Sequence, residues 1–543
     1  MEKSGHVDSF ARDNLPPQAQ WPHFLLDRPE FAYPPRFNCA VSFLDDMVAK
    51  GFGPRDCILS PEGRWTYSDL LGQVNRIAAV LTGRFGLEPG NRVLLRAPNN
   101  PMMVATYLAV IKAGGVVVAT MPLLRAKELA TIIEKAKITH AVCDARLTEE
   151  LDKARRVAPS LTTVVIFGDA APESLETMAA GAPDRFEACD TAAEDVCLIG
   201  FTSGTTGVPK GTMHFHRDML AICDAYSHHL LRPTPDDRFI GSPPLAFTFG
   251  LGGLVLFPLR VGASTVLLEK ASPPDLLKGV EDFRATISFT APTAYRAMIP
   301  LLEGRNISSL RICVSAGEAL PKPTFDAWKE ATGIAITEGI GATEMLHIFI
   351  GSSPDDVRPG ATGKPVPGYE ARVVDDAMND VPDGTPGRLA VRGPTGCRYL
   401  ADDRQATYVR DGWNVTGDTY VRDGDGYFWY QARSDDMIVS AGYNIAGPEV
   451  EAALLTHPAV KECGVVGQPD PDRGMIVKAY VVPSAGVTPG DDLVKALQDH
   501  VKAEISPYKY PRAVEFVSEL PRTDTGKLRR SVLRERAATP AAF

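Results

Sequence analysis

The stretch Phe201-Thr-Ser-Gly-Thr-Thr-Gly-Val-Pro-Lys210-Gly211 is the most informative segment of the chain. Its small and hydroxylated residues let backbone amides and hydroxyl groups approach phosphate oxygens closely, and Lys210 adds a cation. It is not a Walker A loop, because its two internal glycines are only three residues apart and Lys210 is followed by glycine. The segment therefore predicts a phosphate-binding loop unlike that of GTPases, the alternative being an ordinary exposed Ser/Thr/Gly turn.

Patterns typical of helices and strands alternate on both sides of this loop, from about residue 43 to residue 268. Apolar residues recur at helical spacing from Leu70 to Leu81, after the candidate cap Thr66, and residues 92–95 are typical of a buried strand. This alternation predicts an α/β architecture in which helices cover the sheets.

The texture of the sequence changes twice in the second half of the chain. Between about residues 358 and 430, Gly, Pro and Asp turns separate short strands, which indicates a β-rich subdomain. Residues 1–433 are thus expected to form a large α/β unit of several subdomains. Residues 434–543 are expected to form a small, mobile α+β domain, with a helix starting near Pro448 and a flexible tail over residues 520–530.

Composition excludes several classes of protein. Hydrophobic residues make up 44% and charged residues 23% of the 543 residues, which is typical of a folded globular chain. A net charge of -10 lacks the basic excess that nucleic-acid binding requires, so we expect no nucleic-acid partner.

No targeting, membrane or zinc-binding pattern is evident. The most apolar run, residues 102–111, is far shorter than a membrane span, and residues 1–13 lack the apolar core of a signal peptide. The nine cysteines occur singly, so a reducing, cytoplasmic location is predicted, without membrane attachment. Four paired histidines lack a third ligand at suitable spacing, so we interpret them as ordinary helix or surface residues: His214, His216, His228 and His229.

Four further motifs make the chain resemble the superfamily of adenylate-forming enzymes, which includes acyl-CoA synthetases, peptide-synthetase adenylation domains and firefly-type luciferases. They are Ile340-Gly-Ala-Thr-Glu344, Thr416-Gly-Asp418, Arg433-Ser-Asp-Asp-Met-Ile438 and Pro521-Arg-Thr-Asp-Thr-Gly-Lys527. With the phosphate loop they stand in the family's order and cover nearly the whole chain. The resemblance implies activation of a carboxylic acid by ATP, followed by transfer to coenzyme A.

The resemblance also implies a nucleotide site. Attack of a carboxylate on the α-phosphorus needs positioning and positive charge more than a general base. Lys527, Thr343 and Glu344 are the implied catalytic residues, and Glu344 is the implied magnesium ligand. The implied ATP- and AMP-binding residues are Thr202, Ser203, Gly204, Thr205, Thr206, Lys210, Gly317, Glu318, Ala319, Gly339, Ile340, Asp418 and Arg433.

A hinge at Asp435 is implied between the large and the small domain. In the family, the small domain rotates there, presenting Lys527 for adenylation and then the Gly442 segment, with Tyr443, for thioester formation with coenzyme A. A plain linker is the alternative at Asp435.

Within the superfamily, residues 344–349 and 315–321 resemble the benzoate–CoA ligase branch, and 2-aminobenzoate is the best single guess at the acid. The implied acyl-pocket residues are Ala225, Tyr226, Phe247, Gly341 and His347. Core packing is an equally good interpretation of Tyr226 and Phe247. Relatives that activate amino acids place an aspartate where this chain has Phe247, which argues against an α-amino acid.

Alternatives remain at this stage: benzoate or another substituted benzoate as the acid, a luciferase-like oxygenase, or a stand-alone adenylating enzyme that loads a separate carrier protein. The intact Lys210, Glu344, Asp418 and Lys527 speak against a catalytically silent nucleotide-binding protein. The sequence leaves a homodimer open.

Overall fold

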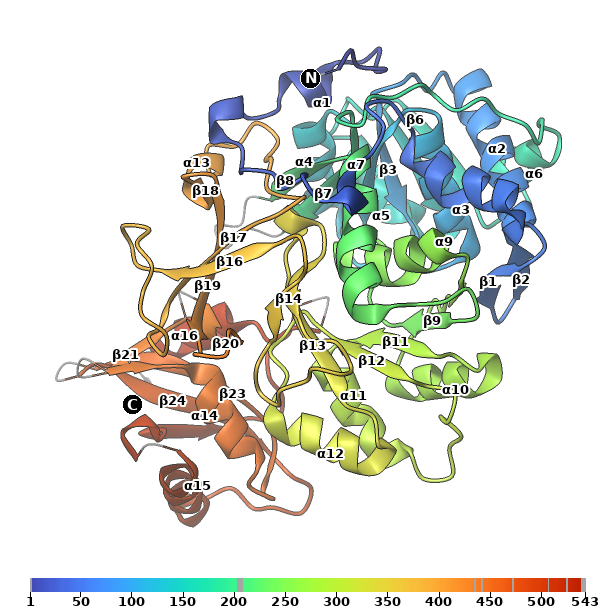
Figure 1. Ribbon diagram of the computed structural model, residues 1–543. Coiled ribbons are helices and arrows are strands. Elements are labelled where there is room, and N and C mark those ends of the chain that lie inside the picture. The colour runs from blue at the N-terminus through green and yellow to red at the C-terminus, as the bar shows by residue number, and fades with distance from the viewer. Residues whose placement is uncertain are drawn as a thin grey trace.

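The computed structural model describes residues 2–202, 209–433, 436–440, 443–470, 473–505, 507–523 and 526–538. These residues form four sheets covered by helices, which confirms the predicted mixed α/β fold with a C-terminal α+β unit (Figure 1). Within the described residues, no helix is long and apolar enough to cross a membrane.

The first half of the chain builds a six-stranded sheet that is parallel except for its last strand. In spatial order its strands are β6 (Thr163–Phe167), β5 (His140–Asp144), β3 (Arg92–Arg96), β4 (Val116–Thr120), β7 (Val196–Thr202) and β8 (Lys210–Phe215). Helix α2 (Tyr67–Gly83) precedes β3 in the chain, and the helices between the following strands include α3 (Pro101–Lys112), α4 (Ala126–Ala136) and α5 (Thr148–Arg155).

Helix α2 shows how the sequence fixes a local element. Thr66 caps it in a reciprocal capping box with Asp69, and the apolar residues from Leu70 to Leu81 bury the face that the sequence predicts. The antiparallel pair β7 and β8 brackets the predicted phosphate loop, so the loop joins two strands.

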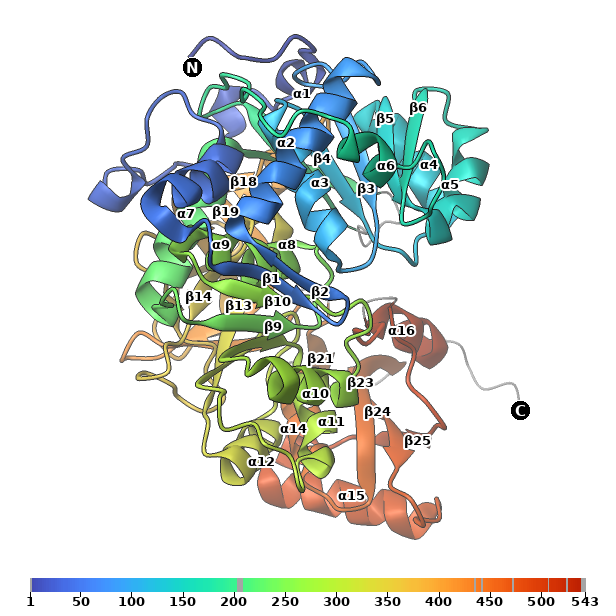
Figure 2. The same cartoon turned by 90° about the vertical axis from the view of Figure 1, so that its right-hand side faces the viewer.

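A nine-stranded sheet forms the second layer of the large unit. In spatial order its strands are β15 (Lys364–Pro365), β14 (Ile348–Gly351), β13 (Ile336–Gly341), β12 (Ile312–Ser315), β11 (Ile287–Thr290), β9 (Arg238–Gly241), β10 (Ser264–Val266), β1 (Asp56–Ser60) and β2 (Gly63–Thr66). Helices α10 (Pro273–Phe283), α11 (Pro292–Met298) and α12 (Lys322–Thr332) lie beside it (Figures 1 and 2).

The predicted β-rich subdomain is an antiparallel sheet. It contains β16 (Glu370–Val374), β17 (Gly387–Arg392), β19 (Trp413–Arg422), β18 (Val409–Arg410) and β20 (Phe428–Arg433). Figure 1 shows this sheet between the first sheet and the C-terminal unit.

The C-terminal unit has its own hydrophobic core around Val450, Val481 and Leu497. Its strands are β22 (Tyr443–Ile445), β21 (Ile438–Ser440), β24 (Gly474–Pro483), β23 (Val460–Asp470) and β25 (Ala513–Phe516), and its helices are α14 (Gly447–Leu455), α15 (Asp491–Glu504) and α16 (Arg530–Ala538). Pro448 opens α14 as predicted. The boundary at residue 433 stays a prediction.

The segment that the sequence suggests is a flexible tail is instead folded back on itself. Arg522 and Leu528 form a β-bridge, and the Thr523 backbone and hydroxyl bond to Lys527. These backbone contacts hold the turn that carries Lys527.

Candidate nucleotide and acyl site

A chain of three side chains links the phosphate loop to the β13 motif. Lys210, the first residue of β8, donates a 3.1 Å hydrogen bond to the Tyr399 hydroxyl, which in turn donates one of 2.5 Å to Glu344 Oε1. Burial and the negative charge of Glu344 raise the pKa of Tyr399. Tyr399 is absent from the sequence-based site because no motif surrounds it, and only the fold brings it beside Lys210.

Thr343 lies directly against strand β7. A Cβ atom on Gly200 would lie 2.8 Å from Thr343 Cγ2, so the strand needs a glycine where the two segments meet. The buried His214 on β8 donates from Nε2 to the Thr343 carbonyl at 2.8 Å. The interpretation of His214 as an ordinary helix or surface histidine is therefore wrong: it is a strand residue that anchors the motif.

Asp418 and Arg433 face each other across strands β19 and β20, where they are register partners. Arg433 Nη1 lies 3.1 Å from Asp418 Oδ1. Burial raises the pKa of the Asp418 carboxyl, and the Arg433 guanidinium opposes that shift. Asp418 is thus a buried carboxyl that the Arg433 side chain contacts directly.

The loop after β12 carries the predicted adenine-side residues Gly317, Glu318 and Ala319. Gly317 has φ +89°, a conformation that favours glycine, and a Cβ atom there would lie 3.4 Å from Lys527 Cε and 3.6 Å from its Nζ. Lys527 therefore lies over this loop, against the large unit. Gly339 and Ile340 follow on β13, whose end carries Gly341.

The ammonium group of Lys527 is placed among charged groups of the nucleotide side. Although its side chain is exposed, surrounding protein disfavours the charged form and lowers the pKa of Lys527, an effect that Glu318 opposes. Burial raises the pKa of Glu318 in turn, and Arg522 and Lys527 oppose that rise. The predicted catalytic residues thus lie beside segments of the predicted nucleotide site: Lys527 beside Gly317, Thr343 beside β7, and Glu344 beside Tyr399.

Two of the predicted acyl residues, Tyr226 and His347, lie together in a cluster of aromatic rings, and His347 is 2% exposed. Its ring centroid lies 5.4 Å from that of Tyr226, 4.6 Å from Phe257 and 5.8 Å from Phe249. Within the described residues neither ring nitrogen of His347 makes a hydrogen bond of ordinary geometry, although the Phe249 backbone lies close enough to oppose the lowering of its pKa, and the Tyr226 hydroxyl makes none either. Burial lowers the pKa of His347 to about 3, so the imidazole is neutral.

The other acyl-pocket predictions have different positions. Ala225 is buried beside Tyr226 on η6 (Cys223–Leu231), and a Cβ atom on Gly341 would lie 2.8 Å from the His347 carbonyl oxygen. Phe247 is half-buried and precedes α8 (Thr248–Leu251). The ring that contacts His347 is Phe249, two residues further on, which the sequence reasoning missed although it lies in the same segment.

Several predicted positions lie outside the described residues. They are Ser203, Gly204, Thr205 and Thr206 of the phosphate loop, the hinge residue Asp435, and Gly442 of the coenzyme A segment. Thr202, at the end of β7, is described and half-buried. The backbone of Tyr443 begins β22, and its side chain is not among those described.

Comparison with protein families places these features in a known class. Residues 46–399 match the AMP-binding enzyme family, and residues 449–527 match the AMP-binding enzyme C-terminal domain. The chain belongs to the AMP-binding enzyme family. Within this adenylate-forming superfamily it falls in the benzoate–CoA ligase branch, and it is an AMP-forming acid–CoA ligase that uses ATP and coenzyme A.

Individual relatives cover nearly the whole chain. Benzoate–CoA ligase of Thauera aromatica is 35% identical over 513 residues, 93% of this chain and 97% of the relative. 3-Hydroxybenzoate–CoA ligase of Aromatoleum sp. (strain CIB) is 34% identical over 92% of this chain and 96% of the relative. The crystal structure of the anthranilate CoA ligase AuaEII in complex with anthranoyl-AMP has a TM-score of 0.90 and 35% identity, covering 95% of this chain and all of that one.

Proposed function

We propose that this ligase activates a benzoate-type acid, 2-aminobenzoate being the preferred substrate, as the acyl-adenylate and then transfers the acyl group to coenzyme A. The similarity to benzoate–, 3-hydroxybenzoate– and anthranilate–CoA ligases supports an aryl acid. The alternative of another substituted benzoate differs only in the group on the ring.

The proposal rests on two buried polar groups that lie within a cluster of aromatic rings. His347 and the Tyr226 hydroxyl lie among aromatic rings without hydrogen-bond partners in the described part of the chain. A buried polar group without a partner costs about 1–3 kcal/mol, so a ligand that supplies a partner gains that amount. An apolar wall of rings suits the flat face of a benzoate.

A 2-amino group fits this arrangement chemically. A neutral imidazole has one N–H donor and one bare nitrogen acceptor, and an arylamine is neutral at pH 7 and donates N–H. The arylamine would pair with the bare nitrogen of His347, whereas benzoate would leave that nitrogen unpaired. A site built around a polar substituent rejects the analogue that lacks it more strongly than an apolar pocket does.

We assign the nucleotide-side residues roles by their positions. Lys527, over Gly317, would stabilise negative charge on the α-phosphoryl group as the carboxylate attacks, and Thr343 would donate a hydrogen bond. Asp418 would accept hydrogen bonds from the ribose hydroxyls, while Arg433 holds the carboxylate in place. Attack forms the acyl–phosphate bond, breaks the bond to the β-phosphate and releases pyrophosphate.

Glu344 suits a magnesium ion. It offers a buried carboxylate, the ligand type that this ion prefers, on the same short turn as Thr343. Bound there with the phosphates, magnesium would neutralise charge on the departing pyrophosphate. Tyr399 donates to one oxygen of Glu344 and would keep the carboxylate oriented.

The second half-reaction uses residues outside this arrangement. We propose that rotation about Asp435 withdraws Lys527 and presents the segment with Gly442 and Tyr443 to coenzyme A. The thiol then attacks the acyl carbon, the thioester bond forms and AMP leaves. Lys527 at Gly317 corresponds to the arrangement for the first half-reaction.

Substrate and acceptor are tested together by incubating the enzyme with ATP, magnesium and a panel of acids, with and without coenzyme A, and identifying products by mass. The panel contains 2-aminobenzoate, benzoate, acetate and octanoate. We expect the 2-aminobenzoyl thioester to form with the highest kcat/KM, and only the adenylate to form without coenzyme A. Octanoate outperforming both aryl acids tenfold would refute the aryl assignment, and an adenylate that never passes to coenzyme A would favour a carrier protein.

A further inference from the structure

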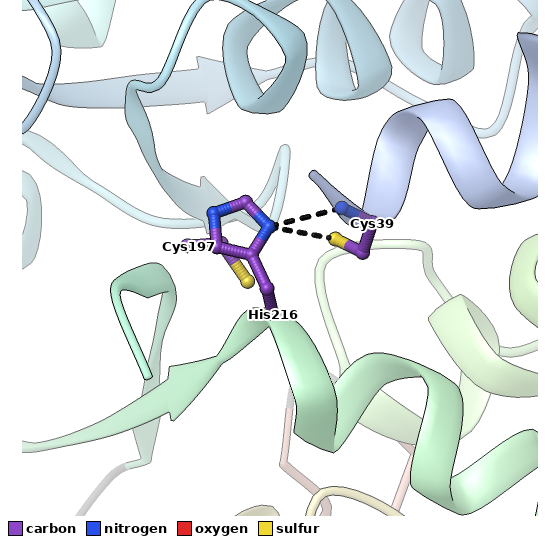
Figure 3. A group of neighbouring side chains, drawn as sticks. All are labelled: Cys39, Cys197 and His216. Atoms are coloured by element: carbon purple, nitrogen blue, oxygen red, sulfur yellow. Dashed lines mark hydrogen bonds between the residues drawn. The ribbon is translucent and has the colours of Figure 1, made fainter. Parts of the chain in front are cut away.

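A second cluster of reactive side chains lies away from the nucleotide and acyl residues. Cys39, Cys197 and His216 come from three distant segments, and one ligand atom of each lies within 4.8 Å of the other two (Figure 3). All three are fully buried. Cys39 precedes η3 (Val41–Asp45), Cys197 lies on β7, and His216 is the first residue of α7 (His216–Ile222).

Not every buried polar atom of this cluster makes a hydrogen bond with the described residues. His216 Nδ1 lies 3.1 Å from the Cys39 amide nitrogen, which donates to it, and 3.2 Å from Cys39 Sγ, as Figure 3 shows. His216 Nε2 has no partner among the described residues, and neither has the hydroxyl of Tyr107 on α3.

We propose that Cys39, Cys197 and His216 bind one zinc ion. In a tetrahedral thiolate–imidazole site the ligand atoms are about 3.5–3.8 Å apart, because Zn–S is about 2.3 Å and Zn–N about 2.0 Å. The Nδ1–Cys39 Sγ separation of 3.2 Å would open slightly to meet that geometry, and any separation near the upper limit of 4.8 Å would close by about 1.0–1.3 Å.

Charge balance favours zinc in this buried position. Two thiolates and a neutral imidazole cancel the charge of Zn²⁺, so the filled site is electrically neutral in a dry interior. Two thiol protons leave when the ion binds, and the two zinc–sulfur bonds replace them.

The sequence could not reveal this group, because its members are separated by 158 and 19 residues and show no zinc spacing. The interpretation of His216 as an ordinary helix or surface histidine is thus corrected: it begins a helix, but it is buried against two cysteines. The ion would join the segment before η3 to the strand that leads into the phosphate loop, and would therefore contribute to stability.

The test measures bound metal directly and does not depend on activity. The full-length enzyme is treated with a chelator, equilibrated with one equivalent of Zn²⁺, passed through gel filtration and weighed by native mass spectrometry. We expect one zinc per chain, a higher Tm, and a thiolate-to-metal charge-transfer band when Co²⁺ replaces zinc. A chain that retains no zinc and gives no such band would overturn the proposal.

Variants locate the ion. Cys39→Ala and Cys197→Ala should lose the zinc, whereas Cys313→Ala, at an equally buried cysteine on β12, should keep it. His216→Asn retains an acceptor for the Cys39 amide and removes the imidazole ligand, so it should weaken zinc binding at least tenfold while leaving the metal-free Tm near wild type. Zinc retained by the Cys39→Ala/Cys197→Ala double variant, or a mass loss of two hydrogens in place of a gain of zinc, would show that this cluster is not a metal site.

Discussion

The proposed nucleotide site (the nucleotide side) and the proposed acyl site (the acyl side) of this enzyme consist of different types of residue. On the nucleotide side, charged and hydroxylated residues occupy strand ends and turns, and Lys210, Tyr399 and Glu344 form a continuous hydrogen-bonded chain. On the acyl side, the His347 imidazole is enclosed by rings and makes no hydrogen bond of ordinary geometry with the described residues. The paired polar groups of the nucleotide side can act on any acid. The unpaired imidazole among the rings instead favours an acid that can form a hydrogen bond with it. Chemistry and selectivity should therefore respond to separate substitutions.

The largest expected effect is that of Lys527→Ala. Removing a positive charge from the α-phosphoryl group should lower adenylate formation by 10²-fold or more, about 3 kcal/mol, for every acid alike. Pyrophosphate release measures this step, and supplied acyl-adenylate with coenzyme A measures the second. Lys502→Ala, on α15 of the same unit, serves as the control. Equal loss of both steps would refute the division of labour between the two half-reactions.

Tyr399→Phe should cost about tenfold in kcat/KM for all acids, because it deletes the hydroxyl between Lys210 and Glu344 at a cost of about 1–2 kcal/mol. Tyr408→Phe is the matched control: its ring packs against Tyr399, but within the described structure its hydroxyl makes no hydrogen bond. Steady-state kinetics with 2-aminobenzoate and benzoate check both variants. A change in the ratio between the two acids would contradict the separation of the two sides.

Phe249→Leu should affect the binding of the acid and leave the binding of ATP unchanged. Loss of the ring beside His347 removes about 0.5–1.5 kcal/mol of aromatic contact, so KM for aryl acids should rise about two- to tenfold while KM for ATP stays constant. Phe325→Leu, a buried phenylalanine on α12, controls for general loss of packing. If both KM values rise together, Phe249 acts on the fold and not on the acyl side.

The smallest effect concerns stability at Glu338, on β13 between the two sides. Burial raises its pKa from 4.5 to about 8, while the Leu320 amide donates to its Oε1 at 3.1 Å. Between these pH values the unfolded chain loses a proton that the folded chain keeps, so stability should fall as pH rises. Glu338→Gln keeps the acceptor oxygen. Its Tm relative to wild type should improve by a few degrees between pH 5 and pH 8.5, and an unchanged difference would show that Glu338 does not titrate as described.

Site residues that lie within short motifs can be predicted from the sequence. Residues that only the fold brings together cannot. Asp418, Arg433, Glu344 and Lys527 are predicted site residues because each stands in a short motif that resembles one of the family. Tyr399 lies 55 residues from Glu344 and 189 from Lys210, and no local signal marks it. The acyl side shows the same limit for residues that are close in sequence. Phe247 and Phe249 lie in one segment, and only the packing of the folded chain shows that the Phe249 ring contacts His347.

The most direct test of the central claim is the ratio of kcat/KM for 2-aminobenzoate to that for benzoate, measured in wild type and in His347→Leu from pH 6 to pH 8. Leucine keeps an apolar side chain of similar size and removes both ring nitrogens. We predict a wild-type ratio of about ten or more, constant over this range because His347 with a pKa of about 3 does not titrate there, and a ratio near one in the variant. A ratio that is unchanged in His347→Leu would contradict the account.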